Sequence, residues 1–208
     1  IVGQSNGSID GQSINNGQAD GYVSKSSPDG EIIWQKLIGT DFDERITGVD
    51  VDKHGNIYVS GVTTGSLFGD NKGGKDIFVA RLNTDGETEW GVQAGGSGDD
   101  HVWDITLKDE IVLGVTGYTN GSFEGQESRG DSDIFVTEVS AKGEINWSKT
   151  FGGSNFDAGN RITSLSNGDY IIAGRTTGKI DGSIKDSSSQ GYVLALSAIG
   201  EPKWFSYP

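Results

Sequence analysis

Acidic side chains recur at two fixed places along this sequence, and paired carboxylates are its first candidates for chemistry. One place lies directly before an apolar segment such as DIFV or GYVS and holds Asp20, Asp76 and Asp133. The other lies five residues before an apolar Val or Ile and holds Glu44, Asp100 and Asp157. Ca²⁺ takes six to eight oxygen ligands, many of them carboxylates. These six residues form the candidate binding site, and a calcium site would be drawn from Asp76, Asp100, Asp133 and Asp157.

A second interpretation of the same carboxylates needs no ligand. An Asp at the start of a strand can cap a turn by accepting hydrogen bonds from backbone N–H groups, and this explains its recurrence. The D-x-D-x-D-G spacing of a specific calcium loop is absent from the sequence. Capping is the favoured interpretation, so we expect no cofactor and keep calcium as the alternative.

Catalytic groupings are sparse. The sequence has two histidines, His54 and His101, and no cysteine. His101 follows Asp100 and could act as a base, but no serine stands in a nucleophile elbow to pair with it. The sequence also lacks a glycine-rich phosphate-binding loop. We therefore expect the protein not to be an enzyme.

The elements that would position these residues follow from an internal repeat. Four tryptophans stand 56, 57 and 57 residues apart, and each closes one of the segments GEIIW, GETEW, GEINW and GEPKW. They are Trp34, Trp90, Trp147 and Trp204. A fixed period of this size sets the architecture, because each copy must bury its apolar face against its neighbours.

Each unit contains four segments typical of strands. In the third unit they lie at 99–107, 111–121, 134–139 and 144–151, rich in β-branched and aromatic residues and bounded by turn formers. No stretch shows the apolar spacing of a helix. The pattern predicts an all-β fold, a β-propeller with four-stranded blades at about 1–40, 41–97, 98–154 and 155–208. The innermost strands are expected at 45–51, 101–107 and 161–166.

The first copy is shorter than the others. Residues 1–11 match 59–69, which contain the second strand of the next unit. The first blade is therefore expected to lack its inner strand. We expect a single propeller segment that belongs to a larger propeller, with further blades or modules in the same polypeptide.

The four periodic tryptophans are expected on the outermost strand of each blade. A large flat ring there can cover the space between two blades, and packing explains its recurrence in every unit. Stacking on a sugar is the alternative. Replacing Trp90 or Trp147 by alanine would cost about 3–5 kcal/mol if the ring is fully buried.

The longest connections are expected on one face of the propeller. They are the glycine- and aspartate-rich segments 7–20, 65–76, 121–133 and 178–190, together with 39–44, 95–100 and 152–157. Functional residues concentrate on long loops held by a rigid frame. The long-loop face is therefore where a partner is expected to bind.

Composition excludes several classes of partner. The chain of 208 residues carries 30 acidic and 16 basic side chains, a net charge of −14. Binding a phosphate backbone requires Lys and Arg to displace counterions, so no nucleic acid is expected. No segment has the roughly 18 apolar residues that span a membrane, so membrane insertion is not expected.

The repeated text resembles the SBBP β-propeller repeat family. The resemblance is carried by T-x-G-S-[LF]-x-G, D-[IF]-F-V, G-E-x-x-W, G-G-S-x-x-D and G-N-I-Y-V-S-G, at 61–69, 76–79, 86–90, 95–100 and 55–61. It extends over nearly the whole chain. The fourth copy departs from it, with Lys179 in place of Ser and Gln190 in place of Asp. The resemblance implies a bacterial protein that is secreted or displayed on the cell surface, and it implies no activity.

These observations predict a non-enzymatic module, structural or adhesive, that binds protein or glycan at the cell surface through its acidic long-loop face. The alternative is a hydrolase or oxidoreductase with its site at the propeller axis. That alternative depends on polar residues that differ between blades where the inner strands meet the long-loop face. They are Arg45, His101, Asp104, Asn160 and Arg161.

Overall fold

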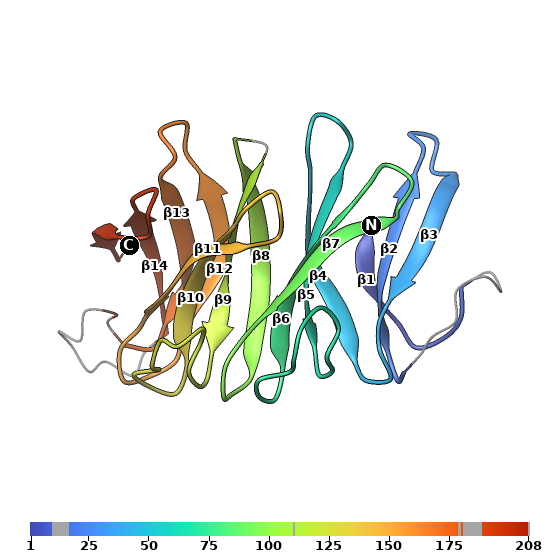
Figure 1. Cartoon of the computed structure of the whole chain (residues 1–208). Coiled ribbons are helices and arrows are strands. Elements are labelled where there is room, and N and C mark those ends of the chain that lie inside the picture. The colour runs from blue at the N-terminus through green and yellow to red at the C-terminus, as the bar shows by residue number, and fades with distance from the viewer. Residues whose placement is uncertain (10–16, 110, 179, 181–188, 208) are drawn as a thin grey trace.

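The computed structural model describes residues 1–9, 17–109, 111–178, 180 and 189–207. Every regular element in these residues is a strand (Figure 1). The strands are β1 Val2–Ser5, β2 Asp20–Ser26, β3 Ile32–Ile38, β4 Glu44–Val51, β5 Ile57–Thr63, β6 Asp76–Leu82, β7 Thr88–Ala94, β8 Asp100–Lys108, β9 Val112–Thr119, β10 Asp133–Val139, β11 Ile145–Phe151, β12 Asp157–Ser164, β13 Tyr170–Thr176, β14 Gln190–Leu196 and β15 Pro202–Ser206. Among the described residues there is no helix of the length and apolarity that a membrane crossing needs.

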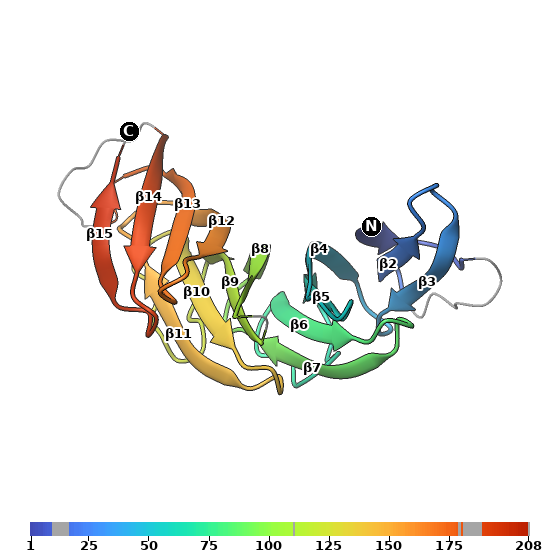
Figure 2. The same cartoon turned by 90° about the horizontal axis from the view of Figure 1, so that it is seen from above.

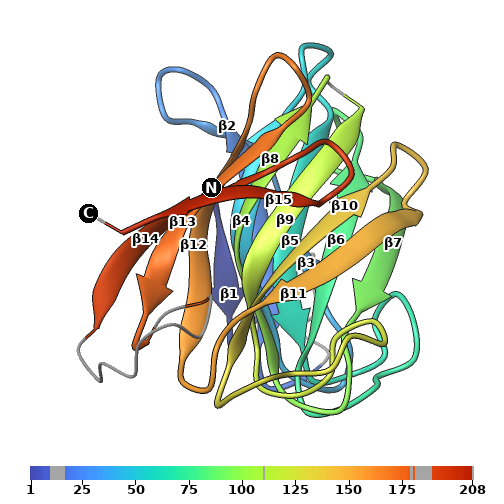
Figure 3. The same cartoon turned by 90° about the vertical axis from the view of Figure 1, so that its left-hand side faces the viewer.

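The strands form one three-stranded and three four-stranded antiparallel sheets, each a meander in chain order. The predicted β-propeller fold is confirmed, and the described residues of the first blade form three strands, as expected. Figure 2 shows the four sheets fanned in an arc, with β4, β8 and β12 on its concave side and β3, β7, β11 and β15 on its convex side. The inner strands β4, β8 and β12 also stand side by side in Figure 3.

One inner strand begins earlier than expected. β12 runs from Asp157 to Ser164, whereas the sequence pattern placed this strand at 161–166. Its first residues, DAGN, lack the alternating apolar pattern of a strand, and glycine is disfavoured there. Pairing with β13 overrides that local preference, with a register shift between Gly159 and Arg161.

The core consists of three apolar clusters, and each joins two neighbouring sheets. The middle cluster contains Phe135 and Val115 of the third sheet together with Ile77 of the second. The two middle strands of the second and third blades are almost entirely buried. Every cluster therefore depends on two adjacent blades, as expected for a repeat that cannot bury its apolar face alone.

Three of the four periodic tryptophans pack between blades, as predicted. Trp90 on β7 lies over Gly143 in the β10–β11 turn of the next blade, where a methyl group on the glycine would come 2.8 Å from Trp90 Cε3. Trp34 lies in the same way over Gly86, and Trp147 over Gly200. These three rings are only partly buried, so the condition of full burial in the sequence-based estimate is not met. Trp204 is 49% exposed.

We expect Gly143→Ala to destabilise the protein more than Gly30→Ala. Both glycines adopt left-handed backbone conformations, with φ of 79° and 87°, in equivalent turns. Alanine costs about 1–2 kcal/mol there for conformational reasons alone. At Gly30 a methyl group meets nothing within 4 Å, whereas at Gly143 it meets Trp90. Overpacking should add a further 1–3 kcal/mol at Gly143. Equal losses in urea unfolding would contradict the blade contact.

The long connections gather at the lower edge of Figure 1, as the strand order requires. Parts of two of them, residues 10–16 and 181–188, lie outside the described residues, as does Lys179. The starts of β2, β6, β10 and β14 stand at this edge. Backbone hydrogen bonds place the starts of β2, β6 and β10, at Asp20, Asp76 and Asp133, beside the starts of β4, β8 and β12.

Candidate functional site

The predicted carboxylates lie inside the junctions between blades. At the junction of the second and third blades, Asp76 begins β6 and Asp100 begins β8, and both side chains are 0% exposed. Asp76 Oδ2 accepts hydrogen bonds from the Lys72 backbone N–H at 2.9 Å and from Gln93 Nε2 at 3.0 Å. Asp100 Oδ2 accepts one from the Gly96 N–H at 2.9 Å. The Oδ1 atom of each carboxylate is buried and has no hydrogen-bond donor.

The next junction repeats this arrangement. Asp133 and Asp157 begin β10 and β12 and are 0% and 1% exposed. Asp133 Oδ2 accepts the Arg129 N–H at 2.5 Å, and Asp157 Oδ2 accepts the Gly153 N–H at 2.7 Å. The Oδ1 atoms again have no donor. Turn capping through Oδ2 is therefore present, as expected, and it leaves half of each carboxylate without a hydrogen bond.

The first junction differs because Glu44 stands where the others have Asp. Its Oε1 accepts hydrogen bonds from the Thr40 and Thr63 hydroxyls, and its Oε2 accepts the Thr40 N–H at 2.7 Å. Asp20 is buried beside Gly39 at the same junction. In the fourth blade the amide of Gln190 donates to the Gly178 carbonyl at 3.2 Å.

The burial of these six residues corrects the expectation that they contact a partner. A protein or glycan cannot contact Asp20, Asp76, Asp133, Glu44, Asp100 or Asp157 directly, because all six are at most 1% exposed. The sequence pattern identified where they stand along the strands but not that two blades close over them. Burial raises the pKa of the Asp100 carboxyl to about 7, and the Asp76 charge acts in the same direction. Burial likewise raises the pKa values of Asp133 and Asp157.

A different part of the long-loop face is open to solvent. Each inner strand contains a β-bulge, marked by a register shift around Thr47 in β4, Trp103 in β8 and Asn160 in β12. A bulge leaves one residue out of the pairing pattern and can redirect its side chain. Thr47 and Trp103 line a cavity of about 380 Å³ on the concave side of the arc.

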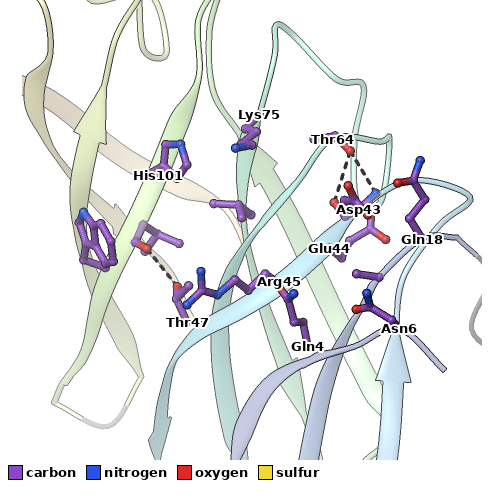
Figure 4. Close-up of a pocket in the computed structure, with 14 residues that line it drawn as sticks. Gln4, Asn6, Gln18, Asp43, Glu44, Arg45, Thr47, Thr64, Lys75 and His101 are labelled. Atoms are coloured by element: carbon purple, nitrogen blue, oxygen red, sulfur yellow. Dashed lines mark hydrogen bonds between the residues drawn. The ribbon is translucent and has the colours of Figure 1, made fainter. Parts of the chain in front are cut away.

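This cavity, the axial pocket, brings together basic groups from three places in the chain. Arg45 comes from β4, His101 from β8 and Lys75 from the loop before β6, and Figure 4 shows their side chains around the cavity. Burial lowers the pKa of His101, and the nearby charges of Lys75 and Arg45 lower it further. Among the described residues, neither Arg45 nor Lys75 forms an ion pair with an acidic side chain.

Amide and aromatic side chains complete the axial pocket. Gln4, Asn6 and Gln18 line the side formed by the first blade. On the opposite side Trp103 is 38% exposed, and its ring centroid lies 6.4 Å from that of Tyr118. His101 also stacks on Tyr118, with the two ring centroids 4.7 Å apart. The pocket therefore offers cations, amides and an exposed indole to one ligand, and Asp43 and Glu44 also line it.

The structure brings together only some of the polar residues that the sequence placed at the propeller axis. Arg45 and His101 share the axial pocket, whereas Asp104 and Arg161 line a separate recess between β8 and β12. Asp104 is occupied by a hydrogen bond from the Ile162 N–H at 2.9 Å. Asn160 lines neither. Trp103 was missed, although it is the one tryptophan outside the 57-residue spacing and differs from Thr47 and Asn160 at the equivalent positions.

Comparisons with known proteins agree with the repeat. Residues 33–69 match the family model described as SBBP, a beta-propeller repeat. The chain is 24% identical over 199 residues to Regulatory protein FlaEY of Caulobacter vibrioides, a match that covers 85% of this chain and 20% of that protein. The chain therefore spans only a small part of this curated relative.

Among solved structures, the chain is similar to an α-L-arabinofuranosidase, CtGH43, from Clostridium thermocellum, with a TM-score of 0.47 and 16% identity over 93% of this chain and 66% of that one. It is also similar to a variant of the apocarotenoid oxygenase from Synechocystis, with a TM-score of 0.46 and 12% identity over 93% and 45% of the two chains.

Proposed function

We propose that this chain, a β-propeller segment with SBBP-type repeats, is a non-enzymatic binding module that takes an acidic glycan into its axial pocket at the bacterial cell surface. The observation that carries the proposal is the convergence of Arg45, Lys75 and His101 on one cavity in a protein of net charge −14. Asp43 and Glu44 also line this cavity, so the proposal rests on the placement of Arg45 and Lys75 and not on a net positive charge of the pocket.

The chemistry of the axial pocket suits a carboxylated sugar. Arg45 can hold a carboxylate through two parallel N–H bonds, and Lys75 can add a point charge. The amides of Gln4 and Gln18 are both donors and acceptors, as sugar hydroxyls require. The exposed ring of Trp103 gives a sugar ring an apolar face to stack on. Polar groups that converge on a partly apolar cavity are the usual features of a small-molecule site.

The proposal predicts that charge removal in the axial pocket weakens binding. We expect Arg45→Gln combined with Lys75→Gln to weaken binding of uronic-acid oligosaccharides at least tenfold, since each lost charge-assisted contact is worth about 1.5–3 kcal/mol. Trp103→Ala should weaken it by a similar factor. The measurement is isothermal titration calorimetry after a first screen on an array of acidic and neutral glycans.

Arg161→Gln is the matched control, because Arg161 is also an exposed arginine on an inner strand but lies outside the axial pocket. It should bind like the original chain. A folded protein that binds no acidic glycan, or one whose binding survives the double substitution, would overturn the proposal. Capture of an acidic peptide instead would favour a protein ligand. Shortened oligosaccharides after incubation would favour the enzyme alternative.

A further inference from the structure

Four buried carboxylates share an arrangement that a turn cap does not explain. In Asp76, Asp100, Asp133 and Asp157, Oδ2 accepts a backbone N–H bond, while Oδ1 is buried without a donor. A single oxygen of this kind could be an accident of packing. Its recurrence in both members of two successive pairs points to a common missing partner, because buried polar groups are normally satisfied.

At the junction of the second and third blades, Asp76 and Asp100 face the same small space. A methyl group built on Gly95 would come 2.3 Å from Asp76 Oδ1 and 2.7 Å from Asp100 Oδ2, so both carboxylates converge on this glycine. At the next junction, a methyl group on Gly152 would come 1.9 Å from Asp133 Oδ1. Two like charges held this close and out of water repel each other, and a positive charge between them removes that cost.

The first and last blades provide an internal comparison. Glu44 occupies the place of Asp100 and Asp157, and the hydroxyls of Thr40 and Thr63 donate to its Oε1. Gln190 occupies the place of Asp76 and Asp133, and its amide needs no counter-charge. The two junctions that hold an Asp–Asp pair are therefore the ones where both carboxylates have an Oδ1 atom without a donor.

We propose that each of these two junctions binds one hard divalent cation of the Ca²⁺ type. One cation lies between Asp76 and Asp100, and the other lies between Asp133 and Asp157. Ca²⁺ accepts carboxylate and backbone carbonyl oxygens in a flexible geometry. No group of three or more acidic, His or Cys side chains suited to a metal occurs among the described residues. Backbone carbonyls and water must therefore supply the remaining ligands, as in sites of moderate affinity. The cation joins the third strand of one blade to the first strand of the next.

Calcium titration of EDTA-treated protein tests this directly. Isothermal titration calorimetry should show two equivalents of Ca²⁺ per chain. At about a hundredfold excess over Kd, Ca²⁺ filling both sites should raise the melting temperature by roughly 10–20 °C, whereas NaCl at the same ionic strength should not. Asp76→Asn and Asp133→Asn should each remove one equivalent and leave the other.

Asp52→Asn is the matched control, because Asp52 is a buried carboxylate whose two oxygens are both hydrogen-bonded, to His54, Asn56 and Tyr58. It should destabilise the protein but keep two equivalents. A folded original chain that binds no Ca²⁺ overturns the proposal, and this result needs no variant to fold. Two equivalents retained by Asp76→Asn would overturn it equally.

Discussion

Replacing Trp90 by alanine is expected to lower the free energy of unfolding by about 3 kcal/mol, the lower end of the range for large aromatic core residues. Trp90 joins two blades: its ring centroid lies 6.3 Å from that of Tyr58 in its own sheet, and its six-membered ring covers Gly143 of the next. Trp90 Nε1 has no hydrogen-bond partner, so the loss comes from packing. Partial burial of the ring keeps the cost below that of a fully buried tryptophan.

Trp204→Ala is the natural comparison for Trp90→Ala. Trp204 occupies the same place in its blade but is 49% exposed. Exposed substitutions usually change stability by about 0.5 kcal/mol or less. Urea unfolding of the two variants and the original chain measures the difference. Similar losses would show that the tryptophans act within their own sheets and not between blades.

The repeat is the reason why the fold could be predicted. Residues that serve the same contact in every blade, such as Trp34, Trp90 and Trp147 over their glycines, must recur at the blade period. Each blade must also bury its apolar strands on its neighbour, so local pattern and global fold agree. The start of β12 at Asp157 was missed because this agreement fails locally at Gly159 and Asn160.

The candidate sites were less predictable, for a physical reason. The positions of Asp76 and Asp100 are 24 residues apart in the sequence, and only the stacking of two blades brings them together and excludes water. The spacing of residues along the sequence does not show that water is excluded from them. The axial pocket depends on bulges that redirect Thr47 and Trp103, and a bulge leaves little trace in the residue pattern. The available signal was divergence between blades, which Arg45, His101 and Trp103 all show.

The second large effect expected is a loss of stability with rising pH in the metal-free protein. The pKa of Asp100 is about 7 in the folded state, against an ordinary value of 3.8. Between about pH 4 and pH 7 the unfolded chain has released this proton while the folded chain retains it. The free energy of unfolding should therefore fall by about 1.4 kcal/mol per pH unit across this window for this one group. Asp133 and Asp157, whose pKa values are also raised, act in the same direction.

Other groups change with pH too, and Asp100→Asn separates them. His101, whose pKa is lowered, adds stability as the pH rises towards its ordinary value of 6.5, which opposes the carboxyl effect. The difference between the original chain and Asp100→Asn cancels this contribution and should change steadily in favour of the variant from pH 4 to pH 7. Urea unfolding in EDTA across this range measures it. A difference independent of pH would show that Asp100 is ionised throughout, so its burial beside Asp76 would carry no cost.

Saturating Ca²⁺ is expected to change this pH dependence. A cation bound between Asp76 and Asp100 favours the ionised carboxyl, so its binding tightens as the pH rises and offsets the repulsion that destabilises the metal-free protein. The fall in stability between pH 4 and pH 7 should then become shallower for the original chain with Ca²⁺ present. For Asp100→Asn, Ca²⁺ should alter the slope less, because only the pair formed by Asp133 and Asp157 remains. Repulsion between the paired carboxylates at the two junctions would thus make the contact between blades depend on the bound cation.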